Sequence, residues 1–272
     1  MGKISDALEK RKKEKIIKTR MIYPDRPDTL PVERLPQLSI RENNEYNGID
    51  AKLIVCSAPG SVEAENFKIL RAQILFPKNQ PRKRVIMVTS AFPGEGKTFV
   101  AVNLAASIAQ GINEYVLLVD CDFRRPQMHK LLGCPNTQGL HEYLSGKKKL
   151  NDLILATGIE KLSLIPSGSP SNKPSELLSS LEMKEFFQEV RDRYEDRFII
   201  VDAAPFQVTA EVSVLSNYVE AVIFVVMAGK TPREIINQSI DKIGRENILG
   251  VVFNGYEQGL KRYGKYYRGY YK

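Results

Sequence analysis

Residues 85–98 read VIMVTSAFPGEGKT, and the order of residue types in this segment indicates the fold class. Four apolar residues, Val85–Val88, predict a buried strand, and the sequence then enters a glycine-containing loop that closes in Gly-Lys-Thr. Apolar residues at helical spacing follow from Ala101 to Ile108 and predict a helix. A strand, a loop of this composition and a helix in direct succession form the setting of a phosphate-binding P-loop. The stretch therefore predicts a site for a nucleoside triphosphate.

The loop itself contains the groups that such a ligand needs. Gly94 and Gly96 allow backbone amides to turn towards phosphate oxygens, and the N-terminus of the following helix favours bound anions. We expect Lys97 to reach the β- and γ-phosphates of ATP and the Thr98 hydroxyl to ligate Mg²⁺. The residues predicted to bind the nucleotide are Phe92, Pro93, Gly94, Glu95, Gly96, Lys97 and Thr98.

Short apolar runs alternate with helical stretches along the rest of the chain. This alternation is typical of a mostly parallel sheet with helices on both faces, so the sequence predicts an α/β P-loop NTPase fold. One helix is expected to start at Thr231-Pro232, with the Thr231 side chain as its cap. The runs interpreted as strands are Val85–Val88, Val116–Val119, Leu162–Ile165, Phe198–Val201, Val222–Val226 and Leu249–Phe253.

Carboxylates follow two of these runs. Asp120 and Asp122 come after Val116–Val119, and Asp202 comes after Phe198–Val201. Because open α/β sheets bind ligands at the carboxyl ends of their strands, we expect these side chains beside the P-loop. One Asp can simply cap the turn after a strand, but a pair followed by two arginines favours a functional interpretation. Asp202 has the Walker B arrangement, which holds Mg²⁺ directly or through water.

The formal net charge of +8 is concentrated at the two ends of the chain. Residues 1–20 carry a net charge of +5 and residues 256–272 a net charge of +4, which leaves −1 for the rest. A DNA-binding domain would need a basic face on folded structure, so this distribution argues against nucleic acid as a partner. We expect a basic arm and Pro-rich linker over residues 1–50, a P-loop domain over 51–254 and a tail over 255–272.

Neither a membrane span nor a disulfide framework is indicated. The longest clean apolar run, Ala221–Ala228, is far shorter than the ~20 residues that a membrane helix needs. The three cysteines, Cys56, Cys121 and Cys134, have no CxxC spacing and are typical of reduced thiols. These features favour a cytoplasmic protein.

Six of the twelve tyrosines lie within the last 17 residues, interleaved with Lys, Arg and Gly. Such a composition cannot form a packed core, so we expect a mobile tail. Fully extended, residues 254–272 would span ~60 Å at ~3.3 Å per residue, enough to reach a neighbouring subunit. The pattern also suits stacking on nucleic-acid bases, but beside a P-loop and three carboxylates it favours a substrate. The candidate phosphoacceptors are Tyr256, Tyr263, Tyr266, Tyr267, Tyr270 and Tyr271.

Together these features resemble the bacterial tyrosine kinases of capsule and exopolysaccharide synthesis, over roughly residues 50–272. The resemblance rests on the PGEGKT loop, on DCDFRRP at Asp120–Pro126, on the Walker B strand and on the tyrosine-rich tail. It implies an autokinase that phosphorylates its own tail, subunit on subunit, with Mg-ATP and with Lys97 in the catalytic set. It also implies that Asp120 is the base or metal-linked activator of the attacking tyrosine, and that Asp122 and Asp202 organise Mg²⁺.

The resemblance also implies partners. The family builds a ring of subunits through a Glu-x-x-Arg-x-x-Arg stretch, matched here by Glu65, Lys68 and Arg71. Lys at the middle position keeps the charge but lacks the bidentate fork of Arg, and the stretch also fits a solvated helix face. A stand-alone kinase of this family is implied to work at the inner face of the membrane. There it would meet a separate transmembrane chain-length regulator that activates it, and an opposing phosphotyrosine phosphatase.

Two other functions fit parts of the sequence. ATPase switches of the ParA/MinD type share the fold but carry a signature lysine early in the loop, at the position of Phe92 here. A nucleotide-dependent scaffold of a polysaccharide export complex would need no catalysis, whereas all of the expected ligands are present. We therefore favour the autokinase and keep the switch and the scaffold as alternatives.

Overall fold

The computed structural model describes residues 48–78, 81–194 and 196–256. The chain divides after residue 41 into two units, and all of the described residues belong to the second, residues 42–272. The expected basic arm and the tail tyrosines beyond Tyr256 lie outside the described residues. Among the residues that the structure covers, no helix combines the length and apolar character needed to cross a membrane.

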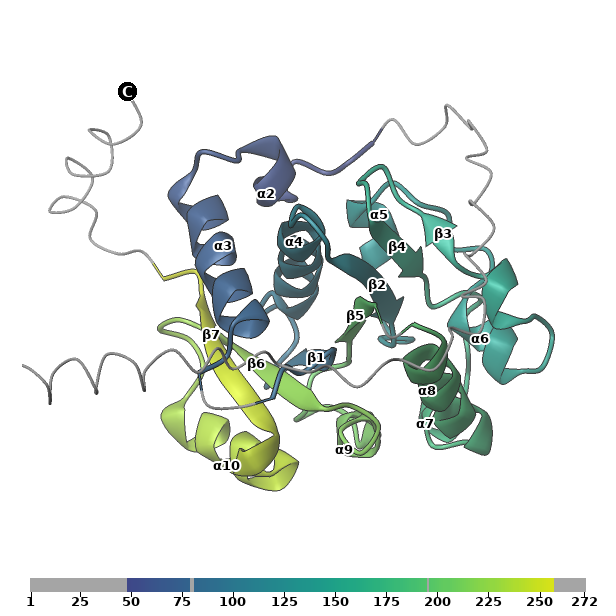
Figure 1. The fold of residues 1–272 in the computed structure, drawn as a ribbon. Coiled ribbons are helices and arrows are strands. Elements are labelled where there is room, and N and C mark those ends of the chain that lie inside the picture. Colours follow the sequence, from purple (N-terminus) through teal and green to yellow (C-terminus); the bar gives the residue numbers. More distant parts are fainter. Residues whose placement is uncertain (1–47, 79–80, 195, 257–272) are drawn as a thin grey trace, which may run out of the picture. The chain divides into compact units, whose positions relative to one another are not determined.

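In the described part of the chain, seven strands form one sheet in the order β3-β4-β2-β5-β1-β6-β7 (Figure 1). Neighbouring strands are parallel, except that β3 runs antiparallel to β4. The six predicted strands are confirmed, and the two-residue β3 was not predicted. The strands are β1 (Val85–Ser90), β2 (Tyr115–Asp120), β3 (Leu155–Ala156), β4 (Leu162–Ile165), β5 (Arg197–Asp202), β6 (Ala221–Met227) and β7 (Ile248–Asn254).

Helices cover both faces of this sheet, as the sequence predicted. One face carries α2 (Ile54–Ser57), α3 (Val62–Leu75), α4 (Lys97–Ala109) and α5 (Met128–Leu131). The other face carries α6 (Leu140–Leu144), α7 (Pro174–Leu178), α8 (Leu181–Arg193), α9 (Glu211–Leu215) and α10 (Arg233–Ile243). Two single 3₁₀ turns, η1 (Leu150–Asp152) and η2 (Arg245–Asn247), complete the described elements.

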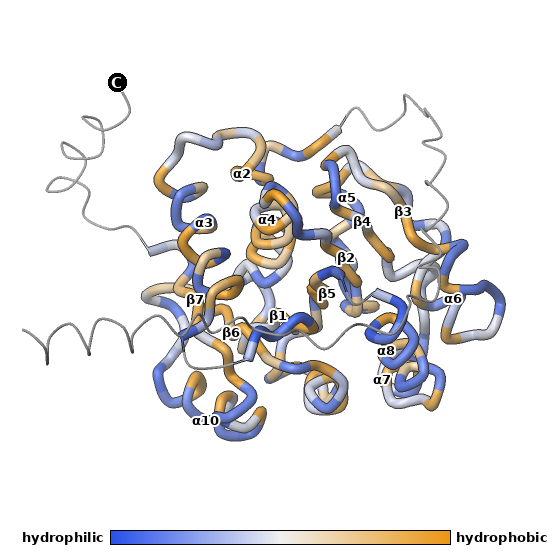
Figure 2. Tube along the Cα trace, viewed as in Figure 1, coloured by the Kyte–Doolittle hydropathy of each residue, from blue (hydrophilic) through white to orange (hydrophobic). Residues whose placement is uncertain are grey.

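The apolar runs are continuous because each central strand contributes to two cores. On β1, Val85 and Met87 pack into the core under α8, whereas Ile86 and Val88 pack into the core under α4. Successive side chains of a strand point to opposite faces, so a sheet buried on both sides needs apolar residues at every position. Helix α4 is hydrophobic along most of its length (Figure 2) and is buried almost throughout. It therefore fixes the loop that precedes it against the centre of the sheet.

The start of α10 differs from the sequence prediction. Pro232, not Thr231, occupies the N-cap position, and no side chain caps the helix. The Thr231 hydroxyl instead donates to the Glu95 carboxylate in the P-loop. The predicted Thr231 cap is wrong because the helix begins one residue later than expected, and the charge-assisted hydrogen bond to Glu95 turns the Thr231 side chain towards the P-loop and away from the first amides of α10, whose protons a capping oxygen would accept.

Candidate functional site

The P-loop lies between β1 and α4, in the strand–loop–helix setting that the sequence predicted. Gly94 and Gly96 have φ angles of +86° and +92°, which side-chain-bearing residues rarely adopt. Gly96 is also the N-cap of α4, so the positive end of that helix follows directly. The loop thus combines turned backbone and a helix N-terminus, the arrangement that binds phosphate groups.

Lys97 lies at the centre of the candidate site. Its ammonium is 2.7 Å from Oδ2 of Asp122 and 3.4 Å from Oδ2 of Asp202. Burial lowers the pKa of Lys97, but the attraction of Asp202 and Asp122 outweighs burial and holds the pKa above its ordinary value. Lys97 is therefore a permanent cation, held where the β2 and β5 strands end.

Asp202 has a free oxygen beside the loop threonine. The Thr98 hydroxyl donates to Oδ2 of Asp202 at 2.5 Å, while Oδ1 of Asp202 is buried without a hydrogen-bond partner. Within the described ranges, no three His, Cys, Asp or Glu side chains are arranged to hold a metal by themselves. Mg²⁺ typically takes only one or two carboxylates, adding waters and substrate phosphates. The orphaned oxygen and the hard oxygen donors of Thr98, Asp122 and Asp202 fit that ion.

Asp120 is close to these groups but is held differently. It pairs in register with Asp202 across β2 and β5, and its carboxylate accepts from the backbone amides of Asp122 (3.2 Å) and Met128 (3.3 Å). Burial, and then the charge of Asp202, raise the pKa of Asp120 to about 8, against the opposing effect of Lys97. Asp120 is fully buried, and it is not among the residues that line the cavity described next.

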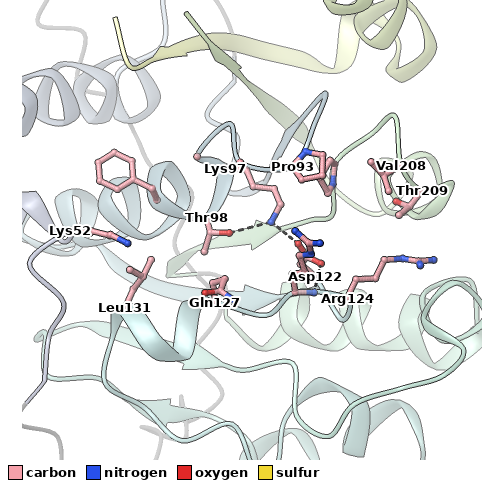
Figure 3. A pocket seen from close by; sticks show the side chains of 15 residues that line it. Lys52, Pro93, Lys97, Thr98, Asp122, Arg124, Gln127, Leu131, Val208 and Thr209 are labelled. Carbon is pink, nitrogen blue, oxygen red and sulfur yellow. Dashed lines mark hydrogen bonds and ion pairs between the residues drawn. The ribbon is translucent and has the colours of Figure 1, made fainter. Parts of the chain in front are cut away.

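A cavity of about 520 Å³, the first cavity, opens over these residues. Figure 3 shows Lys97, Thr98 and Asp122 converging on one point, whereas Arg124 extends away from Lys97. Five predicted loop residues line the cavity, and Phe92 and Glu95 do not. The lining residues are Lys52, Pro93, Gly94, Gly96, Lys97, Thr98, Phe99, Asp122, Arg124, Arg125, Gln127, Leu131, Pro205, Val208 and Thr209.

A second cavity, of about 440 Å³, lies between α3, α4 and the end of β7. Phe99, next to the loop threonine, lines both cavities, and its ring packs edge to face on Phe67 at 5.9 Å. Asn254 and Tyr256 supply polar groups at the β7 end, and Tyr256 is the one candidate phosphoacceptor that the structure describes. The sequence could not predict this cavity, because its walls come from segments as far apart in the chain as Ile54 and Tyr256.

Arg124 is bound by a carboxylate that the sequence did not single out. Glu211 on α9 accepts from Nε (3.1 Å) and one terminal nitrogen (3.0 Å) of the guanidinium, and also from the Ser175 hydroxyl. The Glu211 side chain is fully buried, whereas that of Arg124 is 47% exposed. A buried carboxylate therefore fixes an arginine at the rim of the first cavity.

The predicted oligomer residues lie on α3. Lys68 and Glu65 form an ion pair at 3.0 Å, as expected for positions three residues apart on a helix. Arg71 turns the other way and donates to the backbone oxygen of Ser107 in α4 at 2.7 Å. The three residues are thus split between a half-buried ion pair and a contact between two helices.

Comparison with known proteins gives consistent matches. A family model described as an AAA domain matches residues 83–244. Tyrosine-protein kinase YwqD of Bacillus subtilis (strain 168) is 31% identical over 230 residues, which cover 84% of this chain and 94% of that protein. Tyrosine-protein kinase wzc of Salmonella typhimurium is 30% identical over 224 residues, covering 82% of this chain but only 30% of that longer protein. The solved kinase domain of Escherichia coli tyrosine kinase ETK superposes with a TM-score of 0.69 at 31% identity, over 75% of this chain and 79% of that domain.

Proposed function

The chain belongs to the bacterial tyrosine-protein kinases, and from this premise we propose that it is an autokinase that phosphorylates its own C-terminal tyrosines on a neighbouring subunit. The observation that carries the proposal is the convergence of Lys97, Thr98 and Asp122 on one cavity beside a P-loop. In-line transfer of the γ-phosphoryl group of ATP to a tyrosine hydroxyl needs little more than positioning and charge stabilisation. The loop amides and a permanently charged lysine are suited to both.

Each residue then has a role in the transfer. The loop amides and Lys97 would bind the phosphates and stabilise charge that develops on them. Thr98, Asp122 and Asp202 would hold Mg²⁺, which would neutralise negative charge on the phosphates during the transfer. We assign proton acceptance to Asp120, as the family resemblance implies; because its pKa is raised to about 8, the ionised form that accepts a proton should become more populated as the pH rises towards 8.

We place the nucleoside of ATP in the second cavity. The phosphates are fixed at the loop, and the second cavity is the apolar space on the β7 side of it, lined by Phe67, Phe99 and Tyr256. Aromatic walls with a few polar groups are typical of small-molecule sites. The first cavity, with Asp122 and Arg124 at its wall, is then left open for the acceptor tyrosine.

The proposal extends to partners and process. We propose that the chain regulates polymerisation and export of a capsular or exopolysaccharide, as the family resemblance implies. It would do so as a ring-forming oligomer, with Glu65, Lys68 and Arg71 at the interface, and at the inner face of the cell membrane. A transmembrane chain-length regulator would activate it and a phosphotyrosine phosphatase would reverse its product.

Two forms of the full chain, mixed with labelled ATP and magnesium, test the substrate assignment. The Lys97→Met form keeps its tail but cannot transfer phosphate, whereas a form with all six tail tyrosines changed to Phe can transfer but cannot accept. Label on the C-terminal peptide of the Lys97→Met chain supports transfer between subunits. Label that stays on the Phe form, or release of free phosphate alone, contradicts the proposal, and the second outcome favours an ATPase switch. The absence of both products favours the scaffold.

A further inference from the structure

Glu95 is a negative charge inside a loop that is suited to bind phosphate. The residue is 4% exposed, and it is not among those that line the first cavity. A buried carboxylate loses its hydration, and it also repels nearby phosphate groups unless its charge is taken up by hydrogen-bond donors. The contacts of Glu95 must therefore offset both costs.

The Glu95 carboxylate accepts hydrogen bonds from two different segments. Oε2 accepts from the backbone amide of Phe92 at 2.7 Å, which closes the start of the loop on itself. Oε1 accepts from the Thr231 hydroxyl and, at 3.5 Å, from the backbone amide of Met227 at the end of β6. One side chain thus ties the loop to the turn between β6 and α10.

Asn254 braces the same loop from the neighbouring strand. Its side-chain amide donates to the backbone oxygen of Glu95 at 2.9 Å from the last position of β7. The amide also fills the space beside Gly96, where a β-carbon would lie only 2.0 Å from Nδ2. The loop is therefore fixed on this side both by a hydrogen bond and by direct packing.

We infer that Glu95, Thr231 and Asn254, here called the loop latch, hold the P-loop amides in their nucleotide-binding arrangement, which makes Thr231 a positioning residue for the kinase. Thr231 lines neither cavity and acts on bound nucleotide only through Glu95. A preformed loop binds more tightly because the cost of ordering it is met during folding and not during binding. The inference rests on nucleotide binding at this loop and does not depend on which protein accepts the phosphate.

The hydroxyl of Thr231 is the group that the latch requires. Thr231→Val keeps the shape and removes the donor, so we expect the Kd for Mg-ADP to rise roughly tenfold, equivalent to about 1.4 kcal/mol. Thr231→Ser restores the donor and should bind within twofold of the parent chain. Thr137, an exposed loop residue, provides the matched control, and Thr137→Val should also bind within twofold.

Calorimetric titration of the full chain with Mg-ADP, combined with thermal unfolding, separates positioning from a purely structural role. Loss of thermal stability in Thr231→Val with parent-like affinity would overturn the inference, as would equal affinities of the Val and Ser forms. In Glu95→Ala the hydroxyl has lost its acceptor in the loop and can donate only to the backbone oxygen of Met227 (3.4 Å), so adding Thr231→Val should change the Kd by less than twofold. If the two substitutions raised the Kd independently, so that the double variant showed the product of their separate fold-changes, the latch would be contradicted.

Glu95→Gln provides a second test that does not depend on removing a side chain. A Gln oxygen can accept from the Phe92 amide while its own amide donates to the Thr231 oxygen, so two of the three contacts are kept without the charge and only the 3.5 Å contact with the Met227 amide is lost. We expect its Kd to stay within about threefold of the parent value, well below that of Glu95→Ala. An equal rise in the Kd for Mg-ADP in Glu95→Gln and Glu95→Ala would overturn the inference. A chain that shows these affinities but labels no tyrosine would contradict the proposed substrate and leave the latch standing.

Discussion

Replacing Lys97 with Met removes the cation that faces the buried carboxylates of Asp122 and Asp202. The side chains of Lys97, Asp122 and Asp202 are 11%, 4% and 1% exposed, so water screens the pairs little. Breaking a buried ion pair by removing one partner costs about 3–5 kcal/mol, because a charge is left buried without compensation. We expect the free energy of unfolding at pH 8 to fall by that amount. Since the free energy of unfolding of native proteins is about 5–15 kcal/mol, the variant should still fold.

The loss should depend on pH, and the sign follows from the pKa values of the carboxyl groups. Burial already raises the pKa of Asp120 to about 8 and that of Asp202 above its ordinary value. Without the ammonium, these pKa values rise further in the folded state, while the unfolded state keeps values near 4. The folded variant then binds protons that the unfolded chain does not, so its stability increases as the pH falls from 8 to 6.

Equilibrium urea denaturation of the full chain at pH 8 and pH 6 measures both effects. The control is Lys184→Met at an exposed position on α8, which should change stability by no more than about 0.5 kcal/mol. A Lys97→Met loss of less than about 1 kcal/mol at pH 8 would refute the idea that the pairs are effectively buried. An equal loss at both pH values would refute the protonation argument. The variant should also lack phosphotyrosine, as judged by antibody or mass spectrometry.

Three further outcomes follow from the same geometry. Asp120→Asn should gain stability relative to the parent chain as the pH rises from 5 to 8. Over that range the folded parent keeps the Asp120 proton, because its pKa is raised to about 8, whereas the unfolded parent has lost it, so the free energy of unfolding of the parent falls. A difference in urea midpoint that stays constant with pH would contradict this prediction. Excess magnesium should raise the Tm of Lys97→Met more than that of the parent, because the carboxylates are no longer occupied by the ammonium, and adding Asp202→Asn should remove the gain. Arg124→Ala should cost about 3 kcal/mol by leaving the Glu211 carboxylate buried and unpaired. Arg124→Ala combined with Glu211→Leu should recover most of that loss in the same denaturation assay, and no recovery would argue against the pairing.

The sequence predicts those parts of the site that depend on local chemistry and on strand ends. The P-loop is recognisable because its glycines, lysine and threonine are neighbours in the chain. Asp122 and Asp202 could be assigned to the same edge because parallel strands end together, and the structure does bring both to Lys97. Asp120 lies at the same edge, in register with Asp202, but its carboxyl is fully buried, accepts from backbone amides and does not line the first cavity.

The contacts that the sequence could not predict join segments far apart in the chain. Glu95 and Thr231 are separated by 136 residues, and Arg124 and Glu211 by 87. The sequence assigned Glu95 to nucleotide binding with its loop neighbours, and only the fold reveals that its side chain turns towards the β6–α10 turn. Strand β3 was missed for another reason, since two residues are too few to show any periodicity.

Tyr256 stands apart from the other tail tyrosines because of where β7 ends. It follows Asn254 by two residues, and Asn254 is still paired with Met227 of β6. The Tyr256 side chain lines the second cavity of its own subunit, whereas Lys97 and Asp122 line the first, so Tyr256 would have to leave the second cavity to enter the first cavity of a neighbouring subunit. Tyr263 lies seven residues further on, a contour length of roughly 23 Å beyond Tyr256. Tyr256 is therefore better suited to contacting the nucleoside than to accepting phosphate, and a chain that retains Tyr256 but lacks the other five tail tyrosines separates these two roles.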